Sequence, residues 1–236
     1  MDQPISIAIE TSSRRGSVAL GAGKNLLRVV DFQADQRHAT QLILRLDELL
    51  TGQNLRPKDI QEVYISIGPG SFTGLRVGIT VARTLAQAIS TLRCLAVPTA
   101  NVVAQNAANL DFENLAVLMD AKNQVLYVSC FRRVGGRIVP SRTPELMELS
   151  KLADFLPKPC VIAGEAMLYY NVSGAGITAA PAELYYPTAD SLWRVGSQLS
   201  EHKEVTEINA IRPLYLRKPE AVRLWENRHK SQCGCR

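Results

Sequence analysis

Short apolar runs alternate with longer segments of helical spacing along this 236-residue chain. Runs of four to seven apolar residues bounded by turn residues predict strands, and leucines repeating every three or four positions predict helices. In the first half, strands are expected over residues 5–10, 16–21, 26–32, 63–67 and 94–97, and helices over 38–52, 70–88 and 99–108. The order, three strands and then alternating helices and strands, indicates an α/β protein whose mixed sheet carries helices on its faces.

The second half repeats this pattern more weakly. Strands are expected over residues 115–120, 124–133, 136–140 and 160–163, and helices over 143–156, capped by Thr143 with Pro144 next, and 190–203, capped by Asp190. Each half opens with a strand that ends in a carboxylate, Glu10 or Asp120. The pattern therefore predicts a duplicated unit: subdomains at 1–104 and 105–217, with the final helix packing back on the first, and a tail at 218–236.

Composition fits a globular protein with a substantial core, because 46% of the residues are hydrophobic and 21% are charged. No apolar run approaches the roughly 18 residues of a membrane span. The N-terminal "MDQPISIAIETSS" lacks a basic region ahead of an apolar stretch, so no signal peptide is expected and the protein is interpreted as cytoplasmic, without a membrane partner.

Cysteine and histidine are too scattered to suggest a metal site. Cys94, Cys130 and Cys160 lie in apolar strand-like runs, where buried free thiols are expected. Cys233 and Cys235 form a C-x-C near the end, with His229 as the only further ligand nearby. No nucleophile elbow or catalytic triad pattern is present in the sequence. No metal site and no catalytic residue are therefore predicted.

Positive charge is concentrated at the C-terminus. Residues 212–236 hold seven Lys or Arg and two acids, which accounts for the whole formal net charge of +5. Such a tail is able to contact RNA phosphates, although a simply solvated terminus is the more common explanation.

A stripe of small residues marks the helix predicted at 70–88. Gly70, Gly74, Gly78, Ala82 and Ala86 recur at every fourth position and lie nearly on one helix face. Each helical glycine costs about 0.5–1 kcal/mol relative to alanine, so a compensating close contact is expected. Two interpretations remain open: packing on the protein's own sheet, or a helix contact between subunits.

The turn "GPGSFTG" before this helix is a candidate anion site. A new helix presents free N–H groups, with Ser71 or Thr73 as the alternative cap. The spacing matches neither the P-loop nor the dinucleotide fingerprint. Glu10, Thr11 and Ser12 end the first strand, and Asp120 with Lys122 occupies the matching place in the second half. Such acids and hydroxyls suit a metal or phosphate, though each tripeptide alone is a weak signal.

Four segments together resemble a known family. "IAIETSSRRGSVAL", "RHATQLILRLDELL", "ISIGPGSFTGLRVGITVARTLAQA" and "PLYLR" are similar to the TsaB (YeaZ) family. The likeness is strong over residues 5–100, recurs near 120–127 and returns at 213–217. The resemblance implies the actin-like ATPase (ASKHA, ribonuclease H-like) fold. It also implies a non-catalytic subunit that acts with a catalytic TsaD-like paralogue and a TsaE-like ATPase.

The activity implied by the resemblance is transfer of a threonylcarbamoyl group to N6 of the adenosine beside the anticodon, in tRNAs that read codons starting with A. The tRNA would be contacted indirectly or through the basic tail, and the chain alone would form a homodimer. The expected partner interface consists of Gly70, Gly74, Gly78, Ala82, Ala86, Arg76, His38 and Leu42. Leucine at Gly74 or Gly78 would then block pairing and leave the monomer folded.

Two departures argue against independent chemistry. The family usually has Asp where this chain has Glu10 and Arg where it has Lys122. The stretch "VPTANVVAQN" lacks the two metal-binding histidines that TsaD-like proteins carry there. No cofactor is therefore expected, and a nucleotide would bind only at the partner interface. A possible vestigial phosphate site comprises Glu10, Thr11, Ser12, Gly70, Ser71 and Asp120. The alternatives are an actin-like ATPase or phosphotransferase acting alone, and a tRNA-binding module.

Overall fold

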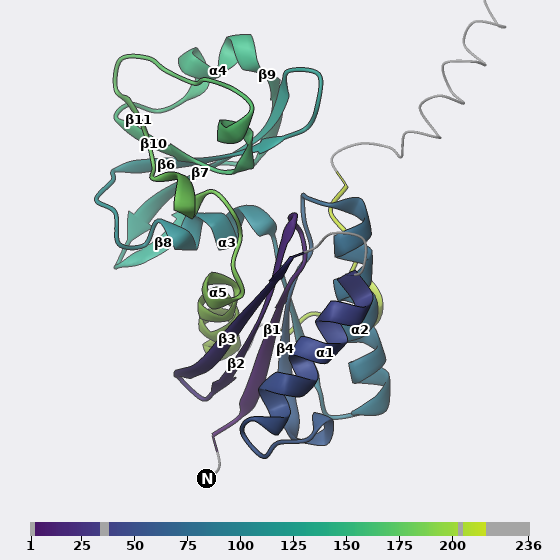
Figure 1. Cartoon of the computed structure of the whole chain (residues 1–236). Coiled ribbons are helices and arrows are strands. Elements are labelled where there is room, and N and C mark those ends of the chain that lie inside the picture. The colour runs from purple at the N-terminus through teal and green to yellow at the C-terminus, as the bar shows by residue number, and fades with distance from the viewer. Residues whose placement is uncertain (1–2, 34–37, 203–204, 216–236) are drawn as a thin grey trace, which may run out of the picture.

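The computed structural model describes residues 3–33, 38–202 and 205–215. It is an α/β structure with two sheets, one in each of two lobes (Figure 1). The first sheet has the strand order β3-β2-β1-β4-β5. Its strands are β1 (Ile5–Glu10), β2 (Arg15–Ala22), β3 (Asn25–Gln33), β4 (Ile60–Ser66) and β5 (Arg93–Val97). β1, β2 and β3 are antiparallel neighbours, whereas β4 and β5 run parallel to β1.

The second sheet repeats this topology. Its order is β11-β10-β6-β7-β8, and β9 also pairs with β7. The strands are β6 (Asn114–Asp120), β7 (Val125–Val134), β8 (Arg137–Pro140), β9 (Glu145–Glu148), β10 (Cys160–Ala163) and β11 (Ile177–Ala179). β6, β7 and β8 are antiparallel neighbours, whereas β10 and β11 run parallel to β6, so β6 corresponds to β1. The predicted α/β class with two related mixed sheets is confirmed.

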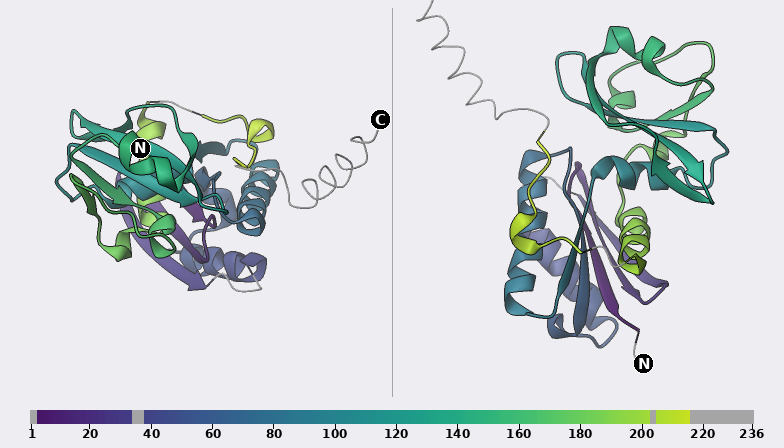
Figure 2. Two further views of the ribbon diagram at one scale, coloured as in Figure 1. Left: turned by 90° about the horizontal axis from the view of Figure 1, so that it is seen from above. Right: turned by 180° about the vertical axis from the view of Figure 1, so that it is seen from behind.

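Helices cover both faces of the first sheet (Figure 2). α1 (His38–Thr51) and α2 (Phe72–Ala88) lie side by side on one face, and α5 (Ala189–Glu201) lies on the other. α3 (Thr99–Asn106) packs against both α5 and β6, and α4 (Leu149–Phe155) belongs to the second lobe. Short 3-10 turns are η1 (Pro57–Asp59), η2 (Glu165–Leu168), η3 (Ala182–Leu184) and η4 (Ile208–Ala210). The predicted boundary at residues 104 and 105 falls inside α3.

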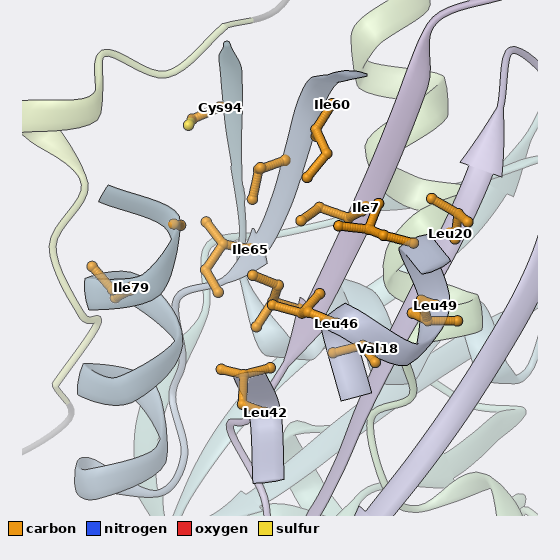
Figure 3. Packing of buried hydrophobic residues seen from close by; sticks show 14 of the residues in the cluster. Ile7, Val18, Leu20, Leu42, Leu46, Leu49, Ile60, Ile65, Ile79 and Cys94 are labelled. Atoms are coloured by element: carbon orange, nitrogen blue, oxygen red, sulfur yellow. The ribbon is translucent and has the colours of Figure 1, made fainter. Parts of the chain in front are cut away.

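Successive side chains of the central strands point to opposite faces of the first sheet, and a buried apolar cluster lies on each face. Ile7 and Ile65 point toward α1 and α2, where Leu42 and Leu49 meet them (Figure 3). Ile9 belongs to the same buried cluster. On the opposite face Ala8, Tyr64 and Leu95 pack with Trp193 of α5. β1 and β4 are thus buried on both faces, as expected for central strands of a sheet covered by helices.

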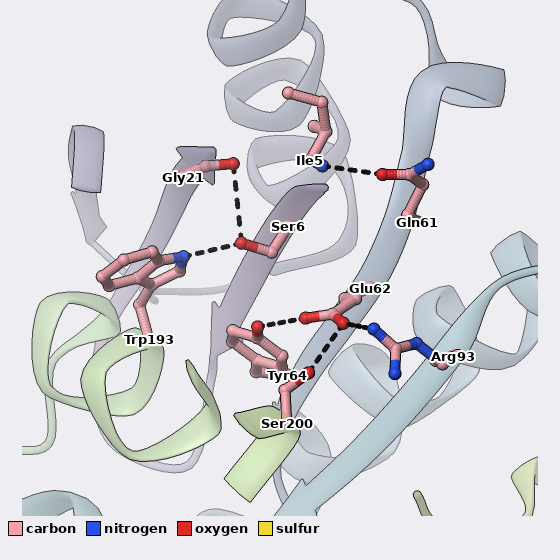
Figure 4. A network of polar contacts seen from close by, with 9 residues as sticks. All are labelled: Ile5, Ser6, Gly21, Gln61, Glu62, Tyr64, Arg93, Trp193 and Ser200. Carbon is pink, nitrogen blue, oxygen red and sulfur yellow. Dashed lines mark hydrogen bonds and ion pairs between the residues drawn. The ribbon is translucent and has the colours of Figure 1, made fainter. Parts of the chain in front are cut away.

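A buried polar network fixes α5 on the first sheet (Figure 4). The Trp193 indole donates to Ser6 Oγ (2.8 Å), and Ser200 Oγ donates to Glu62 Oε1 (2.7 Å). Buried Glu62 also accepts from Tyr64 and Arg93, so its carboxylate has several partners. Because α5 follows the second sheet in the chain, this network holds the second half of the sequence to the first lobe.

Two predictions about helices are wrong. Residues 145–148 form β9, because they pair with Val125–Val128 of β7, and α4 begins only at Leu149. Cross-strand hydrogen bonds outweigh the local signal of Thr143 and Pro144 there. The cap of α5 is Thr188, whose hydroxyl accepts from Ser191 N (3.3 Å), whereas Asp190 pairs with Arg194. The prediction of Ser71 or Thr73 as cap of α2 is resolved in favour of Ser71.

A C-terminal strap, defined as residues 205–215, runs back along the first lobe. Thr206 N donates to Cys94 O (2.7 Å) at the free edge of β5, and Leu214 N donates to Ile67 O (2.7 Å). Arg83 of α2 donates to Ile211 O (2.5 Å), and Ile211 is buried. Its last described residue, Tyr215, lies against Phe72 at the start of α2.

The burial of the cysteines and the lengths of the helices bear on the expectations about free thiols and membrane spans. Cys94, Cys130 and Cys160 are buried free thiols, as predicted, and burial raises the pKa of Cys94 to about 11. The tail at 218–236, with His229, Cys233 and Cys235, lies outside the described residues. Within the described ranges, none of the helices has the length and apolar character needed to traverse a bilayer.

Candidate functional site

The glycine stripe of α2 faces the chain's own first strand. A Cβ at Gly74 would overlap the Thr11 carbonyl oxygen, and a Cβ at Gly70 would overlap that of Ser12. Ser71 N donates to Ser12 O (2.6 Å), and Thr11 Oγ1 donates to Gly74 O (2.9 Å). The small residues are therefore required so that the start of α2 can lie directly against the end of β1.

This geometry corrects the predicted partner interface. Gly74, Gly78, Ala82 and Leu42 are buried inside the chain, so they present no surface to a partner. Because a Cβ at either glycine would overlap Thr11, leucine at Gly74 or Gly78 is now expected to disturb the monomer itself. Arg76 points outward, while Gly70 lies against Ser12 and Ala86 is only partly buried. The His38 side chain lies outside the described side chains.

An exposed apolar surface does exist on the same two helices. We call it the pairing face: Ile43 and Leu44 of α1, Phe72 and Arg76 of α2, and Tyr215 of the strap. The ring centroids of Phe72 and Tyr215 are 5.1 Å apart, and the Arg76 guanidinium lies 4.7 Å from the Phe72 centroid. About half of Leu44 (51%) and two fifths of Phe72 (43%) is exposed. Exposed apolar side chains on two neighbouring helices are typical of protein interfaces.

The carboxylate ending β1 is enclosed by the protein. Glu10 is fully buried, and its Oε1 accepts from Ser12 N (2.7 Å) and Ser12 Oγ (2.5 Å). Its Oε2 has no hydrogen-bond partner within the described part of the chain, and the nearby Ser66 hydroxyl is paired with Thr99 Oγ1 (2.7 Å). Burial raises the pKa of Glu10 above its ordinary value, and the hydrogen bonds from Ser12 only partly oppose this.

The carboxylate ending β6 has a different environment. Asp120 accepts from Lys122 N and Lys122 Nζ (2.8 Å each) and from the Tyr170 hydroxyl (3.1 Å). Burial alone would raise the pKa of Asp120, but the hydrogen bonds and charge of Lys122 outweigh it and lower the pKa. The two strand-end acids predicted as equivalent therefore have pKa values shifted in opposite directions, raised for Glu10 and lowered for Asp120.

Sequence reasoning missed a third carboxyl between the lobes. Glu165 begins η2, directly after β10, and its pKa is raised to about 7. Burial is the main cause and the nearby charge of Glu10 is the next, while Arg14 and Lys122 act in the opposite direction. A signal was present in principle, because β10 is the parallel neighbour of β6 and "AGEA" places this acid at its carboxyl end.

The predicted phosphate site is acidic. The carboxyls of Glu10 and Asp120 lie near enough to Glu165 to raise its pKa, and the Ser71 hydroxyl already accepts from Gly74 N (3.2 Å). A phosphate there would meet carboxylates and a helix N-terminus that is partly capped. Nowhere in the described ranges do three His, Cys, Asp or Glu side chains lie so as to hold a metal ion. The vestigial phosphate site of Glu10, Thr11, Ser12, Gly70, Ser71 and Asp120 stays a prediction.

Comparison with known proteins gives consistent relatives. Residues 29–185 match the family model described as TsaD, tRNA N6-adenosine threonylcarbamoyltransferase. The tRNA threonylcarbamoyladenosine biosynthesis protein TsaB of Bacillus subtilis is 23% identical over 227 residues, covering 93% of this chain and 96% of that protein. TsaB of Escherichia coli is 25% identical over 219 residues, covering 89% and 94%.

A solved structure shows the same fold. The solved structure described as YeaZ from Pseudomonas aeruginosa superimposes with a TM-score of 0.75 at 22% identity, covering 90% of this chain and all of that one. At this level of identity the likeness establishes the fold, including the two-sheet arrangement of Figure 1.

Proposed function

Since this chain belongs to the TsaD family of tRNA N6-adenosine threonylcarbamoyltransferases, and more narrowly to its TsaB (YeaZ) members, we propose that it is the non-catalytic scaffold subunit of such an enzyme. It pairs with a TsaD-like catalytic paralogue through the pairing face. Together with a TsaE-like ATPase, the pair modifies N6 of the adenosine beside the anticodon in tRNAs that read A-starting codons. It acts in the cytoplasm and needs no cofactor of its own.

The pairing face carries this proposal. It lies on α1 and α2, at the lobe where the family resemblance is strongest, and it combines two exposed aliphatic residues with a stacked aromatic pair and an arginine. Aromatic and arginine side chains are enriched among residues that contribute most to protein association. In the absence of the paralogue, the same apolar face favours a homodimer, which is why both assemblies are expected from one surface.

The environment of α3 supports a non-catalytic role. In TsaD-like proteins the corresponding helix is implied to carry two metal-binding histidines, and residues 97–106 of this chain contain none. Ala100, Val103 and Ala104 of α3 are instead buried in the core of the second lobe. These side chains of α3 pack in an apolar core and do not bind a metal, so we assign catalysis to the paralogue.

Reconstitution tests the proposal. Unmodified tRNA, threonylcarbamoyl-AMP, the TsaD-like and TsaE-like proteins of the same organism and ATP are combined with and without this chain, and modified adenosines are counted. We expect modification only when the chain is present, and an unchanged rate with a Glu10→Gln chain that folds normally. Modification without the chain would contradict the scaffold role.

Replacing one apolar side chain of the pairing face with a charged one should weaken pairing. Leu44→Arg is expected to weaken association with the TsaD-like paralogue at least tenfold, because a guanidinium replaces an apolar contact that becomes buried in the complex. The fold should persist, since Leu44 is 51% exposed. Association is measured by titration calorimetry. Leu146→Arg in β9 is the matched control, because Leu146 is 49% exposed on the other lobe; equal losses in the two variants would refute the assigned face.

A second candidate is an actin-like ATPase or phosphotransferase acting alone. The observation that favours it is the Oε2 of Glu10, a buried carboxylate oxygen that has no hydrogen-bond partner in the described part of the chain. Saturable ATP turnover by the isolated chain, abolished by Glu10→Gln, would support this candidate. We favour the scaffold role because the surrounding carboxyls of Glu165 and Asp120 disfavour a triphosphate.

A further inference from the structure

We propose that the pairing face selects its partner by charge, and that Arg76 is the anchor that makes this selection. When the two chains pair, the TsaD-like paralogue supplies a carboxylate to the Arg76 guanidinium. This inference rests on the proposed function, because that function provides the partner. It adds the chemistry that the partner surface presents opposite the start of α2.

Arg76 is held in place before any partner binds. It lies one helical turn after Phe72, and its guanidinium stands 4.7 Å from the centre of the Phe72 ring. The Phe72 ring in turn packs against Tyr215, with 5.1 Å between the ring centroids. Leu214 N donates to Ile67 O (2.7 Å), which fixes the strap beside these rings. A guanidinium positioned in advance loses little side-chain freedom on binding, which suits it as an anchor.

The charge of Arg76 is not neutralised by the residues that the structure describes. The sequence of α2 contains no acid, and among the described residues the Arg76 guanidinium has no ion pair and no hydrogen bond. The other arginines of α1 and α2 do have acceptors. Arg45 pairs with Glu48 (2.8 Å), and Arg83 donates to the Ile211 carbonyl. Arg76 therefore adds an uncompensated positive charge to an otherwise apolar face.

Pairing removes this charge from water. A partner that covers the exposed Phe72 ring must also cover the guanidinium that lies over it. A guanidinium that loses its water without gaining a counter-charge opposes association strongly. The ring compensates the charge in part, but the N–H donors of arginine lie in the guanidinium plane and still need acceptors. A carboxylate meets both needs, because it is negatively charged and accepts two parallel hydrogen bonds from arginine.

A second copy of this chain meets the requirement less well. In a two-fold dimer both faces are the same surface, so the interface receives two Arg76 charges. The acids of α1 are Asp47, which is exposed, and Glu48, which Arg45 already engages. A non-identical partner is not bound by this symmetry and is able to carry an acid at the facing position. Charge therefore favours the paralogue over self-association.

Binding of full-length variants to the paralogue tests the inference. Arg76→Met removes the charge but keeps an apolar side chain, so the carboxylate of the partner would be left without its counter-charge. In titration calorimetry this variant should bind the paralogue about tenfold more weakly or worse. Arg76→Lys keeps the charge but lacks the planar fork, so it should lose less, roughly two- to fivefold.

A matched control uses another exposed arginine. Arg132 of β7 lies on the second lobe, away from the pairing face, and Arg132→Met should bind the paralogue within about twofold of the parent. Because Arg76 and Arg132 are both exposed, each variant should keep the parent fold, which thermal unfolding checks.

Salt dependence identifies the acceptor on the partner. Salt screens a contact between a guanidinium and a carboxylate, whereas it changes a contact with a neutral carbonyl little. The affinity of the parent should therefore fall more steeply with KCl concentration than that of Arg76→Met. Parallel salt curves would mean that the acceptor is neutral, and would overturn the inference.

The remaining outcomes separate this inference from the proposed function. Unchanged binding of Arg76→Met to the paralogue refutes selection by charge. A loss confined to self-association, measured by analytical ultracentrifugation, also refutes it, because the acid would then belong to a second copy. If Leu44→Arg abolishes pairing while Arg76→Met does not, the pairing face and the scaffold role survive and this inference fails. If neither change weakens pairing, the pairing face itself is wrong.

Discussion

Gly74→Ala should destabilise the fold by about 3 kcal/mol or more, against the usual effect of this substitution. In a helix interior, alanine is ordinarily favoured over glycine by about 1 kcal/mol. At Gly74 a Cβ would overlap the Thr11 carbonyl, which is backbone at the end of the central strand and has no rotamer to change. Either α2 or β1 must then move, which breaks the hydrogen bonds Ser71 N to Ser12 O and Thr11 Oγ1 to Gly74 O.

Thermal unfolding measures this effect. For a chain of this size, about 3 kcal/mol lowers the melting temperature by roughly 6–12 °C. Thr80→Ala is the control on the same helix, because Thr80 is exposed on the outward side and its replacement should change stability by less than about 0.5 kcal/mol. A Gly74→Ala protein that melts at or above the parent temperature would show that the strand end yields, and that the stripe is not required for close packing.

The glycine stripe also illustrates what sequence alone provides. A repeat of small residues at every fourth position correctly indicates a helix face that something approaches closely. It does not say which element approaches, because packing on the chain's own sheet and packing on a second subunit both require small residues on that helix face. Here the occupant is the end of β1. The pairing face was missed for a related reason: Ile43 shares the helical repeat of core residue Leu42, yet it is exposed.

The strands and the acids that end β1 and β6 were more predictable than the third acid, Glu165. The duplication and the equivalence of Glu10 and Asp120 followed from the order of elements, which the two sheets repeat. Glu165 required knowledge that β10 lies beside β6, a pairing between segments more than forty residues apart. β9 was mistaken for helix because its pairing with β7 is likewise non-local. Capping and turn residues mark the region where an element starts. In a short segment such as β9, pairing with a distant strand decides whether that element is a helix or a strand.

Glu165 makes the stability of the folded protein fall as the pH rises. Its pKa is raised from 4.5 to about 7 by burial and then by the charge of Glu10, so the folded state holds this proton more tightly than the unfolded chain does. The contribution is therefore fully present below about pH 4.5 and is lost as the pH rises through about 7. At about 1.4 kcal/mol per pKa unit, a shift from 4.5 to about 7 corresponds to a loss of roughly 3 kcal/mol. The raised pKa of Glu10 acts in the same direction.

Glu165→Gln should remove this dependence. The neutral amide keeps the shape of the protonated carboxyl, so the variant should match the parent near pH 4.5 and exceed its stability by about 2–3 kcal/mol at pH 8. Urea unfolding at half-unit pH steps supplies both curves. Glu183→Gln in η3, an exposed position, should follow the parent throughout. If the Glu165→Gln curve instead runs parallel to the parent between pH 5 and 8, the carboxyl is ionised over that range. The lobes would then approach each other with all three acids charged.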